Sequence, residues 1–357
     1  MKQLFALIVH CAVFIGVSKA KIIVVNNNTP SPSQISQIQT AVDTASNGDT
    51  IYVQGSATGY GNVVINKRVV IFGAGYNPSK NNSLPSKLNI VLFDSVTTGA
   101  NAGSSGSGSV IMGFEIAKLS YYASNFVFSN VLIKRNHFIK SSFYNFAGIT
   151  LSCYSAVIEQ NIFDSSAVLD FDLGSGTGCL VRNNIIGCVF RNSNAGSVLL
   201  NNVFVGQSNA FLNISNALIA NNIFYGAAPQ GCTTSTFSNN LTYNTSSNTI
   251  PYGSNTGSGN IVATNPLFVN ATQLAFNYNQ DYHLQAASAG KNAGTDATDI
   301  GLYGGGAPLP AYGGEPPIPQ IKMFDVTPVV KKNTSLQIQI KAKNKTDFIR
   351  CLCVFCF

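Results

Sequence analysis

A short sequence phrase recurs six times between residues 130 and 243, and it constrains the fold more than any other feature. Each copy has two apolar residues, then two further residues and an asparagine, and usually closes on an apolar residue, as in V-L-I-K-R-N-H-F and A-L-I-A-N-N-I-F. A period near twenty residues, carried by short apolar runs with no helix between them, predicts a β-solenoid. The key asparagines, spaced by 25, 23, 18, 20 and 18 residues, are Asn136, Asn161, Asn184, Asn202, Asn222 and Asn240.

The repeat also predicts how the coils stack. Each coil contributes three short strands, and each strand pairs with its counterpart one coil away, at about 4.8 Å. The asparagines lie at a bend, where their amides bond to one another and to backbone groups of neighbouring coils. Between about residue 48 and residue 300 there is room for roughly ten to twelve coils. We expect two interior columns, one of Ile133, Ile158, Val181, Leu199, Ile219 and Phe237, and one of Phe138, Phe163, Ile186, Phe204 and Phe224.

The composition agrees with many short strands joined by turns. Only 10% of the residues are charged, while 32 are glycine, which takes positive φ at little cost. The formal net charge of +7 would fall to +5 if Lys2 and Lys19 were removed with an N-terminal leader. These charges are spread along the chain and form no basic patch beside aromatic residues, so we expect no nucleic-acid partner.

The N-terminus has the pattern of a secretory signal. Lys2 is followed by an apolar run, and Ser18-Lys19-Ala20 is typical of a signal-peptidase site. The run is too short to span a membrane, and no other segment is long enough. We therefore expect a secreted, periplasmic or cell-surface monomer. Its expected parts are a signal peptide at 1–20, a β-helix with an N-terminal cap at 21–304, an exposed Pro/Gly-rich linker at 305–319, a short C-terminal β segment at 320–345 and an aberrant or sorting tail at 346–357.

A helix is predicted before the first coil. Ser31 suits the N-cap, Pro32 suits the first helical position, and the helix is expected to run to about Ser46. Ile38 and Val42 fall on its apolar face. Such a helix would cover the open end of the strand stack, whose core and unpaired edges would otherwise be exposed.

Three further segments support a resemblance to a known family. The run I-Q-T-A-V-D-T-A-S-N-G-D-T-I-Y-V from Ile38, the run V-V-I-F-G-A-G from Val69 and the repeated coils resemble the right-handed parallel β-helix proteins of the pectin-lyase-like superfamily. The segments 265–270, 281–284 and 291–304 resemble the closing coils of exported bacterial β-helix proteins. The resemblance implies an all-β, single-stranded right-handed parallel β-helix. It does not imply one reaction, because the superfamily includes lyases, hydrolases, epimerases and proteins without known activity.

The acidic strand A-V-L-D-F-D-L is the best candidate for chemistry. Alternation places Asp170 and Asp172 on the same outer face, with Arg191 one coil later. In a polysaccharide lyase, Ca²⁺ or basic residues neutralise the uronate and a base removes the α-proton. The strand resembles the one that holds Ca²⁺ in pectate lyases, which makes Asp170 and Asp172 candidate metal ligands and Arg191 a candidate catalytic residue. The alternative is a solvated strand face with a weak cross-coil ion pair.

Other candidates are weaker. Lys134, Glu159 and Arg182 occupy the same position in three consecutive coils and predict an exposed charge ladder, structural or lining a carbohydrate groove. Tyr144 belongs to an aromatic cluster that suits sugar stacking or turn packing. His137 shows no partner in the sequence and is interpreted as structural. The sequence leaves open the disulfide state of Cys153, Cys179, Cys188 and Cys232.

These observations leave two functions open. The first is an exported carbohydrate-binding or structural protein at the cell surface, favoured by the low charge and the lack of a convincing catalytic set. The second is a polysaccharide lyase, or another carbohydrate-active enzyme, acting on a uronate-containing polysaccharide with Ca²⁺ held by Asp170 and Asp172. Polysaccharide is the expected partner in both.

Overall fold

The structure is a computed structural model of the 357-residue chain and divides it into two compact units, residues 1–314 and 315–357. Of the leader predicted at residues 1–20, residues 1–19 lie outside the described residues. The structure describes residues 20–28, 35–77, 84–95, 105–121, 128–139, 147–150, 153–164, 169–172, 177–193, 196–206, 208–316, 320–326, 336–343 and 348–355.

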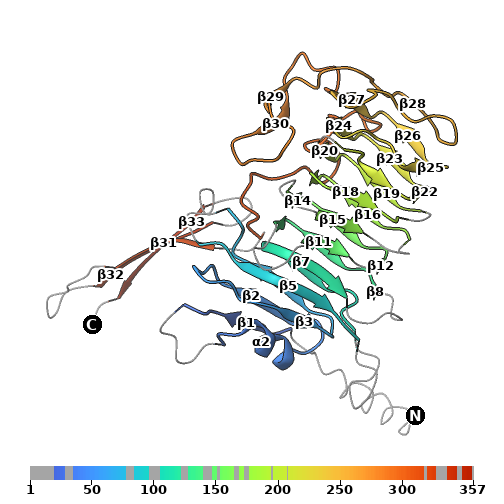
Figure 1. The fold of residues 1–357 in the computed structure, drawn as a ribbon. Helices are drawn as coiled ribbons and strands as arrows, with labels where there is room; N and C mark the ends of the chain where they lie inside the picture. Colours follow the sequence, from blue (N-terminus) through green and yellow to red (C-terminus); the bar gives the residue numbers. More distant parts are fainter. Residues whose placement is uncertain are drawn as a thin grey trace, which may run out of the picture. The chain divides into compact units, whose positions relative to one another are not determined.

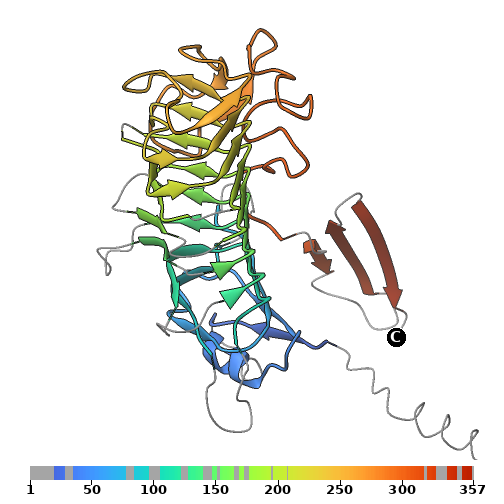
Figure 2. The same ribbon diagram turned by 90° about the vertical axis from the view of Figure 1, so that its right-hand side faces the viewer.

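Two long parallel sheets form the walls of the first unit (Figures 1 and 2). In spatial order, the described strands of the first sheet are β1 (Ile22–Val25), β2 (Thr50–Val53), β4 (Val70–Gly73), β6 (Val110–Met112), β9 (Leu132–Lys134), β13 (Val157–Glu159), β16 (Leu180–Arg182), β19 (Val198–Leu200), β23 (Leu218–Ala220), β26 (Thr236–Ser238) and β28 (Thr256–Ser258). Those of the second sheet are β21 (Phe211–Leu212), β18 (Val189–Arg191), β15 (Leu169–Asp172), β11 (Ala147–Thr150), β7 (Glu115–Tyr121), β10 (His137–Phe138), β14 (Ile162–Phe163), β17 (Ile185–Ile186), β20 (Val203–Val205), β24 (Ile223–Tyr225) and β27 (Leu241–Tyr243), with β3 (Val63–Ile65) and β5 (Lys87–Phe93) joined through β7.

Shorter strand pairs complete the unit. Two parallel pairs lie outside the long sheets, and one antiparallel pair belongs to the closing segment. They are β8 (Phe128–Ser129) with β12 (Cys153–Tyr154), β22 (Ile214–Ser215) with β25 (Cys232–Thr233), and β29 (Phe268–Asn270) with β30 (Asp281–Leu284).

The strand pairing confirms the expected fold class, a single-stranded parallel β-helix, but with fewer regular coils than predicted. In seven coils a strand of the first sheet is followed, after two residues, by a strand of the second sheet, from β6 with β7 to β26 with β27. At the ends the first sheet continues without that pattern, in β1, β2, β4 and β28. The estimate of ten to twelve counted the whole length between residues 48 and 300 as coils, whereas residues 261–300 form the closing segment.

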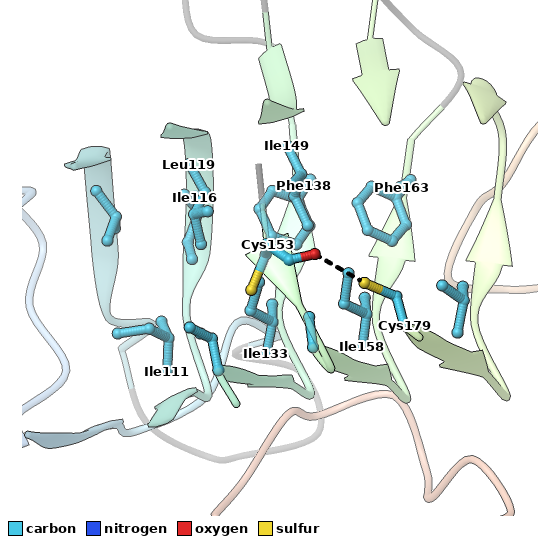
Figure 3. Close-up of a cluster of buried hydrophobic side chains, with 14 of the residues drawn as sticks. Ile111, Ile116, Leu119, Ile133, Phe138, Ile149, Cys153, Ile158, Phe163 and Cys179 are labelled. Atoms are coloured by element: carbon cyan, nitrogen blue, oxygen red, sulfur yellow. Dashed lines mark hydrogen bonds between the residues drawn. The ribbon is translucent and has the colours of Figure 1, made fainter. Parts of the chain in front are cut away.

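Both predicted interior columns are confirmed. The register pairs Ile133 with Ile158 and continues through the first column to Phe237, and every member of the column is fully buried. In the second column Phe138 stacks on Phe163, with ring centroids 4.7 Å apart and the rings almost parallel (Figure 3). Stacking of this kind adds to the roughly 1.5–3 kcal/mol that burial of each such side chain contributes.

The asparagine ladder is also confirmed, and it is longer than the sequence phrase indicated, because Asn260 extends it. At each step the Oδ1 atom of one asparagine accepts hydrogen bonds from the backbone N–H and the Nδ2 group of the asparagine one coil earlier. Asn202 Oδ1, for example, lies 3.0 Å from both Asn184 N and Asn184 Nδ2. Asn202 Nδ2 in turn donates to Val181 O and to the next amide. Each fully buried amide is therefore satisfied on both sides.

The N-terminal capping helix is present but shorter than predicted. Helix α2 spans Ile38–Thr44, and its N-cap is Gln37, so Ser31 is not the cap. Residues 31–34 lie outside the described residues, and Ile35 forms a parallel bridge with Val25 instead of entering the helix. Because Ile38 and Val42 are buried in the core, the helix still closes the first coil.

The segment from Ala293 to Gly314, here called the strap, corrects the prediction of an exposed linker after residue 304. It runs back along the stack from the last regular coil to the first, and Leu309 and Tyr312 in it are buried. A second row of side-chain amides, one per coil, holds the strap. These amides belong to the residues that precede the ladder asparagines, and the backbone φ of these residues lies between 52° and 60°. These contacts are Asn239 Nδ2 to Ala293 O, Asn221 Nδ2 to Thr295 Oγ1, Asn201 Nδ2 to Gly301 O, Asn183 Nδ2 to Leu302 O and Gly304 O, and Gln160 Nε2 to Ala307 O and Pro308 O.

The strap and the closing segment also cover an apolar outer column of the second sheet. Ile162, Ile185, Val203, Ile223 and Leu241 project outward and are buried against residues such as Leu284, Ile300 and Leu302. From Asn161 to Asn240, the residue after each ladder asparagine is therefore apolar because the closing segment and strap cover it. The next residue faces the interior of the coil.

The second unit contains three described strands, β31 (Gln320–Val326), β32 (Leu336–Lys343) and β33 (Phe348–Phe355). They form an antiparallel sheet in the order β31-β32-β33. The sequence predicted β structure for residues 320–345. Phe348–Phe355, which lies in the segment predicted to be an aberrant or sorting tail, pairs along its whole length with β32.

We predict that Asn202→Ala lowers the free energy of unfolding by about 3 kcal/mol, because several buried groups of the ladder lose their hydrogen-bond partner. Urea unfolding followed by circular dichroism measures the change. Asn62→Ala, at an exposed position, is the matched control and should change stability by less than about 0.5 kcal/mol. Equal effects of the two substitutions would show that the ladder does not stabilise the stack.

We predict that Asn183→Gly loosens the strap while leaving the coil intact. Glycine keeps the positive φ of 52° at this position but removes the amide that binds Leu302 O and Gly304 O. Hydrogen–deuterium exchange should accelerate in peptides covering residues 299–309 and stay unchanged in peptides covering β16 and β19. Unchanged exchange in the strap would contradict its attachment by these amides.

Candidate functional site

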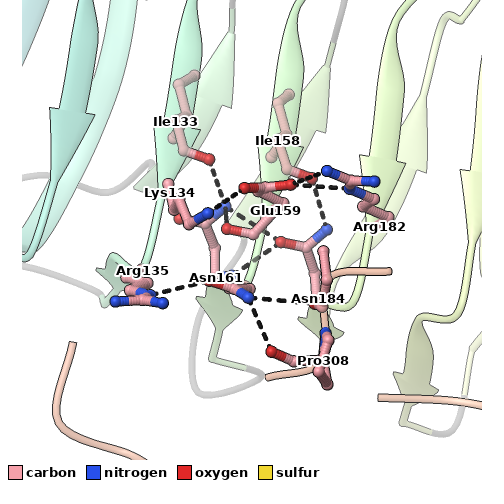
Figure 4. A network of polar contacts seen from close by, with 11 residues as sticks. Ile133, Lys134, Arg135, Ile158, Glu159, Asn161, Arg182, Asn184 and Pro308 are labelled. Carbon is pink, nitrogen blue, oxygen red and sulfur yellow. Dashed lines mark hydrogen bonds and ion pairs between the residues drawn. The ribbon is translucent and has the colours of Figure 1, made fainter. Parts of the chain in front are cut away.

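Two surfaces carry the charged residues that the sequence singled out. The first is the charge ladder on β9, β13 and β16 of the first sheet. The register places Lys134, Glu159 and Arg182 in line on consecutive strands. The carboxylate of Glu159 accepts hydrogen bonds from Lys134 Nζ and, at 2.7 Å, from Arg182 Nε (Figure 4).

The charge ladder is less exposed than predicted. The side chain of Glu159 is only 4% exposed, against 20% for Lys134 and 32% for Arg182. Burial alone would raise the pKa of Glu159, but the hydrogen bonds and charges of Lys134 and Arg182 outweigh it and leave the pKa lowered. Since both cations are engaged by one buried carboxylate, the ion pairs stabilise the stacking of the coils. Substrate binding by Lys134 and Arg182 stays a prediction.

The second surface lies on the outer face of the second sheet, beyond the column covered by the strap. The register places Asp172 of β15 opposite Arg191 of β18, as the sequence predicted, and Asp170 opposite Val189. Asn192 Nδ2 donates to Asp172 Oδ2 at 2.8 Å, and Asn213 Nδ2 donates to Asn192 Oδ1 at 3.2 Å. We call Asp172, Arg191, Asn192 and Asn213 the polar face.

The fit of this face to Ca²⁺ is poor in the residues described. Ca²⁺ takes six to eight oxygen ligands. Of the candidate ligands, Asp172 already accepts a hydrogen bond from Asn192, and the side chain of Asp170 lies outside the described part of the chain. No group of three His, Cys, Asp or Glu side chains suited to a metal occurs among the described residues. Calcium binding by Asp170 and Asp172 stays a prediction, and so does sugar stacking by Tyr144, which also falls outside the described residues.

A buried polar cluster that the sequence did not reveal lies around His137 of β10. His137 Nδ1 and Tyr278 Oη are 2.6 Å apart, although 141 residues separate them in the chain. Burial lowers the pKa of His137 to about 3, so the ring is neutral at ordinary pH. Its Nε2 atom is buried without a hydrogen bond, 3.8 Å from Asp164 Oδ2. Asp164 is 22% exposed and therefore connects the buried ring to the surface.

One signal in the sequence would have found this cluster. In the aligned repeats, His137 occupies the position that is aliphatic in the five following coils, from Ile162 to Leu241. A histidine in an aliphatic column needs a polar partner from outside the repeat. That partner, Tyr278, comes from the closing segment, as does Phe276, and both rings contact the imidazole. Tyr76, from the first coils, contacts it as well.

The cysteines add no chemistry to these surfaces. Cys153, Cys179, Cys188 and Cys232 form no disulfide in the described part of the chain, and Cys153, Cys179 and Cys232 are buried. Burial raises the pKa of Cys153 and of Cys232 to about 12, which makes both thiols poor nucleophiles. Cys179 Sγ donates to Cys153 O at 3.2 Å inside the solenoid (Figure 3).

Comparisons with known proteins support no assignment of a family or an activity. No family model and no curated protein sequence matches the chain. Among solved structures, the crystal structure of the pectin methylesterase from Aspergillus niger in deglycosylated form aligns with 78% of this chain and 95% of its own, at 11% identity and a TM-score of 0.23. A likeness this distant carries no argument. In the described residues, no helix is long and apolar enough to cross a membrane.

We predict a pH-dependent effect of Glu159→Gln. Because the folded-state pKa of Glu159 is lowered, its ionised form stabilises the protein above the unfolded-state pKa, and this contribution disappears as the pH falls through the folded-state value. The wild type should therefore melt at a higher temperature than the variant at pH 7, and the difference should shrink towards about pH 3. Differential scanning fluorimetry across this range is the measurement. A difference that stays constant with pH would contradict the ion-pair interpretation.

Proposed function

We propose that the protein is an exported β-helix that binds a polysaccharide at or outside the cell surface through the polar face. The observation that carries the proposal is the division of the second sheet's outer face. One column is buried by the chain's own closing segment and strap, whereas the polar face stays partly exposed and carries a cation, an anion and amides.

The geometry of the polar face suits a polymer. Asp172, Arg191 and the outward residues beside them recur at the coil spacing of about 4.8 Å, so an extended chain can contact several coils at once. Amide, carboxylate and guanidinium groups are the hydrogen-bonding partners that sugar hydroxyls and carboxylates need. The secretory pattern of residues 1–20 supports a location where such polymers occur.

A polysaccharide lyase is the second candidate. It is favoured by one observation, the placement of Arg191 beside Asp172 on neighbouring strands. In that case Arg191 would neutralise the uronate or assist the base, and Asp170 and Asp172 would hold Ca²⁺. Few of the described side chains can supply oxygen ligands for Ca²⁺. The lyase proposal therefore requires oxygen ligands from the substrate or from solvent to complete the calcium site.

Binding to insoluble or immobilised polysaccharides tests the first proposal. We predict that Arg191→Gln weakens binding to pectate or alginate at least about fivefold, equivalent to about 1 kcal/mol, because a charge-assisted contact is lost. Arg68→Gln is the matched control, since it removes the same charge from an exposed position elsewhere and should leave the affinity unchanged. Equal affinity of the wild type and Arg191→Gln would refute the role of the polar face.

The lyase proposal has its own readout. Ultraviolet absorbance of unsaturated products would rise in a mixture of the wild type with pectate, alginate or a glycosaminoglycan. Under the lyase proposal the rate should depend on Ca²⁺ and be lost in a variant with Asp170→Asn and Asp172→Asn. If the protein binds the polysaccharide but forms no product, with or without Ca²⁺, the result would support the binding function and contradict lyase activity.

A further inference from the structure

The loop between β29 and β30 reaches back along the outer face of the second sheet (Figure 1). We call this part of the closing segment, residues 271–280, the arm. At the base of the arm, Tyr225 Oη of β24 donates a hydrogen bond to Ala271 O at 2.9 Å. At its tip, Tyr278 contacts His137 of β10, which lies four strands away from β24 in the sheet. The arm therefore extends over about 19 Å of the stack and ends on a histidine.

The tip of the arm encloses the imidazole ring in aromatic side chains. The ring centroids of Phe276 and Tyr76 each lie 5.6 Å from that of His137, and the centroid of Tyr278 lies 5.5 Å away. The histidine is 5% exposed, and its register neighbour one coil later is Ile162. Since two of the three rings belong to the arm, opening of the arm exposes the imidazole to water.

The hydrogen bonds of the closed arm fit a neutral imidazole. A neutral ring has one donor and one acceptor nitrogen, whereas both nitrogens of a protonated ring are donors. Tyr278 Oη lies 2.6 Å from His137 Nδ1, and His137 Nε2 is buried without a hydrogen bond among the described residues. Protonation would therefore place a charged N–H in the closed arm without an acceptor, which costs free energy.

The charged groups around the ring do not supply a surplus of negative charge. They are Lys87 and Glu115, which form an ion pair at 3.5 Å on the strands before β10, Arg135 on the same coil, and Asp164 one coil later. These two cations and two anions sum to zero. Asp164 is nearest, at 3.8 Å from Nε2, but it is 22% exposed, so water screens its charge. The other titratable neighbours are tyrosines, which stay neutral because burial raises the pKa of each. They are Tyr76, Tyr278 and Tyr312.

We propose that His137 is a pH-sensitive latch, which holds the arm on the stack near neutral pH and releases it at acid pH. The proposal rests on a histidine that stands in an aliphatic column and that the arm itself covers. It goes beyond the proposed carbohydrate binding and does not depend on it.

Proton binding sets the direction of the change. In the closed arm, burial lowers the pKa of His137 to about 3, whereas an exposed imidazole has a pKa of about 6.5. Between these values the open form binds a proton that the closed form does not. Opening therefore becomes more favourable as the pH falls below about 6.5, by up to about tenfold per pH unit.

Limited proteolysis of the full chain with chymotrypsin tests the latch. This protease cleaves after aromatic residues, so the open arm offers Phe276 and Tyr278, and mass spectrometry identifies the cleavage sites. The rate of cleavage in the wild type is divided by the rate in His137→Gln at the same pH, which cancels the pH dependence of the protease. Because glutamine does not titrate, the ratio should rise about tenfold between about pH 7.5 and about pH 5.5.

His283→Gln is the matched control. His283, on β30, is the other histidine of the described residues, and its side chain is 56% exposed, so its ring is open to water whether the arm is closed or not. This variant should keep the tenfold rise. If circular dichroism shows that His137→Gln does not fold, His137→Leu, which places an aliphatic residue in the column, provides the same comparison.

Three results would overturn the proposal. One is a ratio that does not change with pH, which would show that the closed arm accommodates a protonated ring beside Asp164. Another is a rise that His283→Gln abolishes, which would assign the pH dependence to the other histidine. The third is acid-induced cleavage that is equally fast in the coils and in the arm, which would show that the stack unfolds as a whole.

Discussion

Hydrogen bonding among buried asparagine amides is the constraint on which the rest of the structure depends. A buried amide without partners costs free energy, and these side chains have no access to water. Each finds partners in the coils before and after, at one spacing and one orientation. The ladder therefore sets the register of every regular coil, and with it the alignment of the two interior columns. Residues of different coils become neighbours, as Asp172 and Arg191 do, because the ladder admits no slippage.

The bend that holds the ladder also generates the second row of amides. The residue before each ladder asparagine takes a left-handed conformation, which asparagine tolerates better than most residues. In the coils from Gln160 to Asn239, its side chain then points away from the core and binds the strap. One local geometry thus produces two rows, an inner one that joins coil to coil and an outer one that joins the coils to the returning chain. Positions 135 and 160, occupied by arginine and glutamine, show that a longer polar side chain can take the same conformation.

The features that follow the repeat were predictable from the sequence, and those that cross it were not. The interior columns and the ladder recur every twenty residues or so, so their period reveals them. The strap contacts link residues about 54 to 148 positions apart, so the period of the repeat does not predict them. Its glycines and prolines are typical of an exposed linker, but the same residues suit an extended segment whose carbonyls are bound by side chains. The pairing of His137 with Tyr278 could not be predicted for the same reason. Of the polar face, only Asp172 and Arg191 were predicted, because they lie on strands of the repeat.

The returning strap has a mechanical consequence. The described β-solenoid begins at Lys21, whose backbone N–H binds Asp49 in the first coils, and its strap ends at Gly314, next to Tyr76 and Gly113 in the same region. Tension applied between these two ends passes through the first coils and does not stretch the stack. To pull the strap away, a force must strain its amide contacts in shear along the axis, several at a time. A chain that is drawn through a narrow opening from one end would therefore resist until the strap is released.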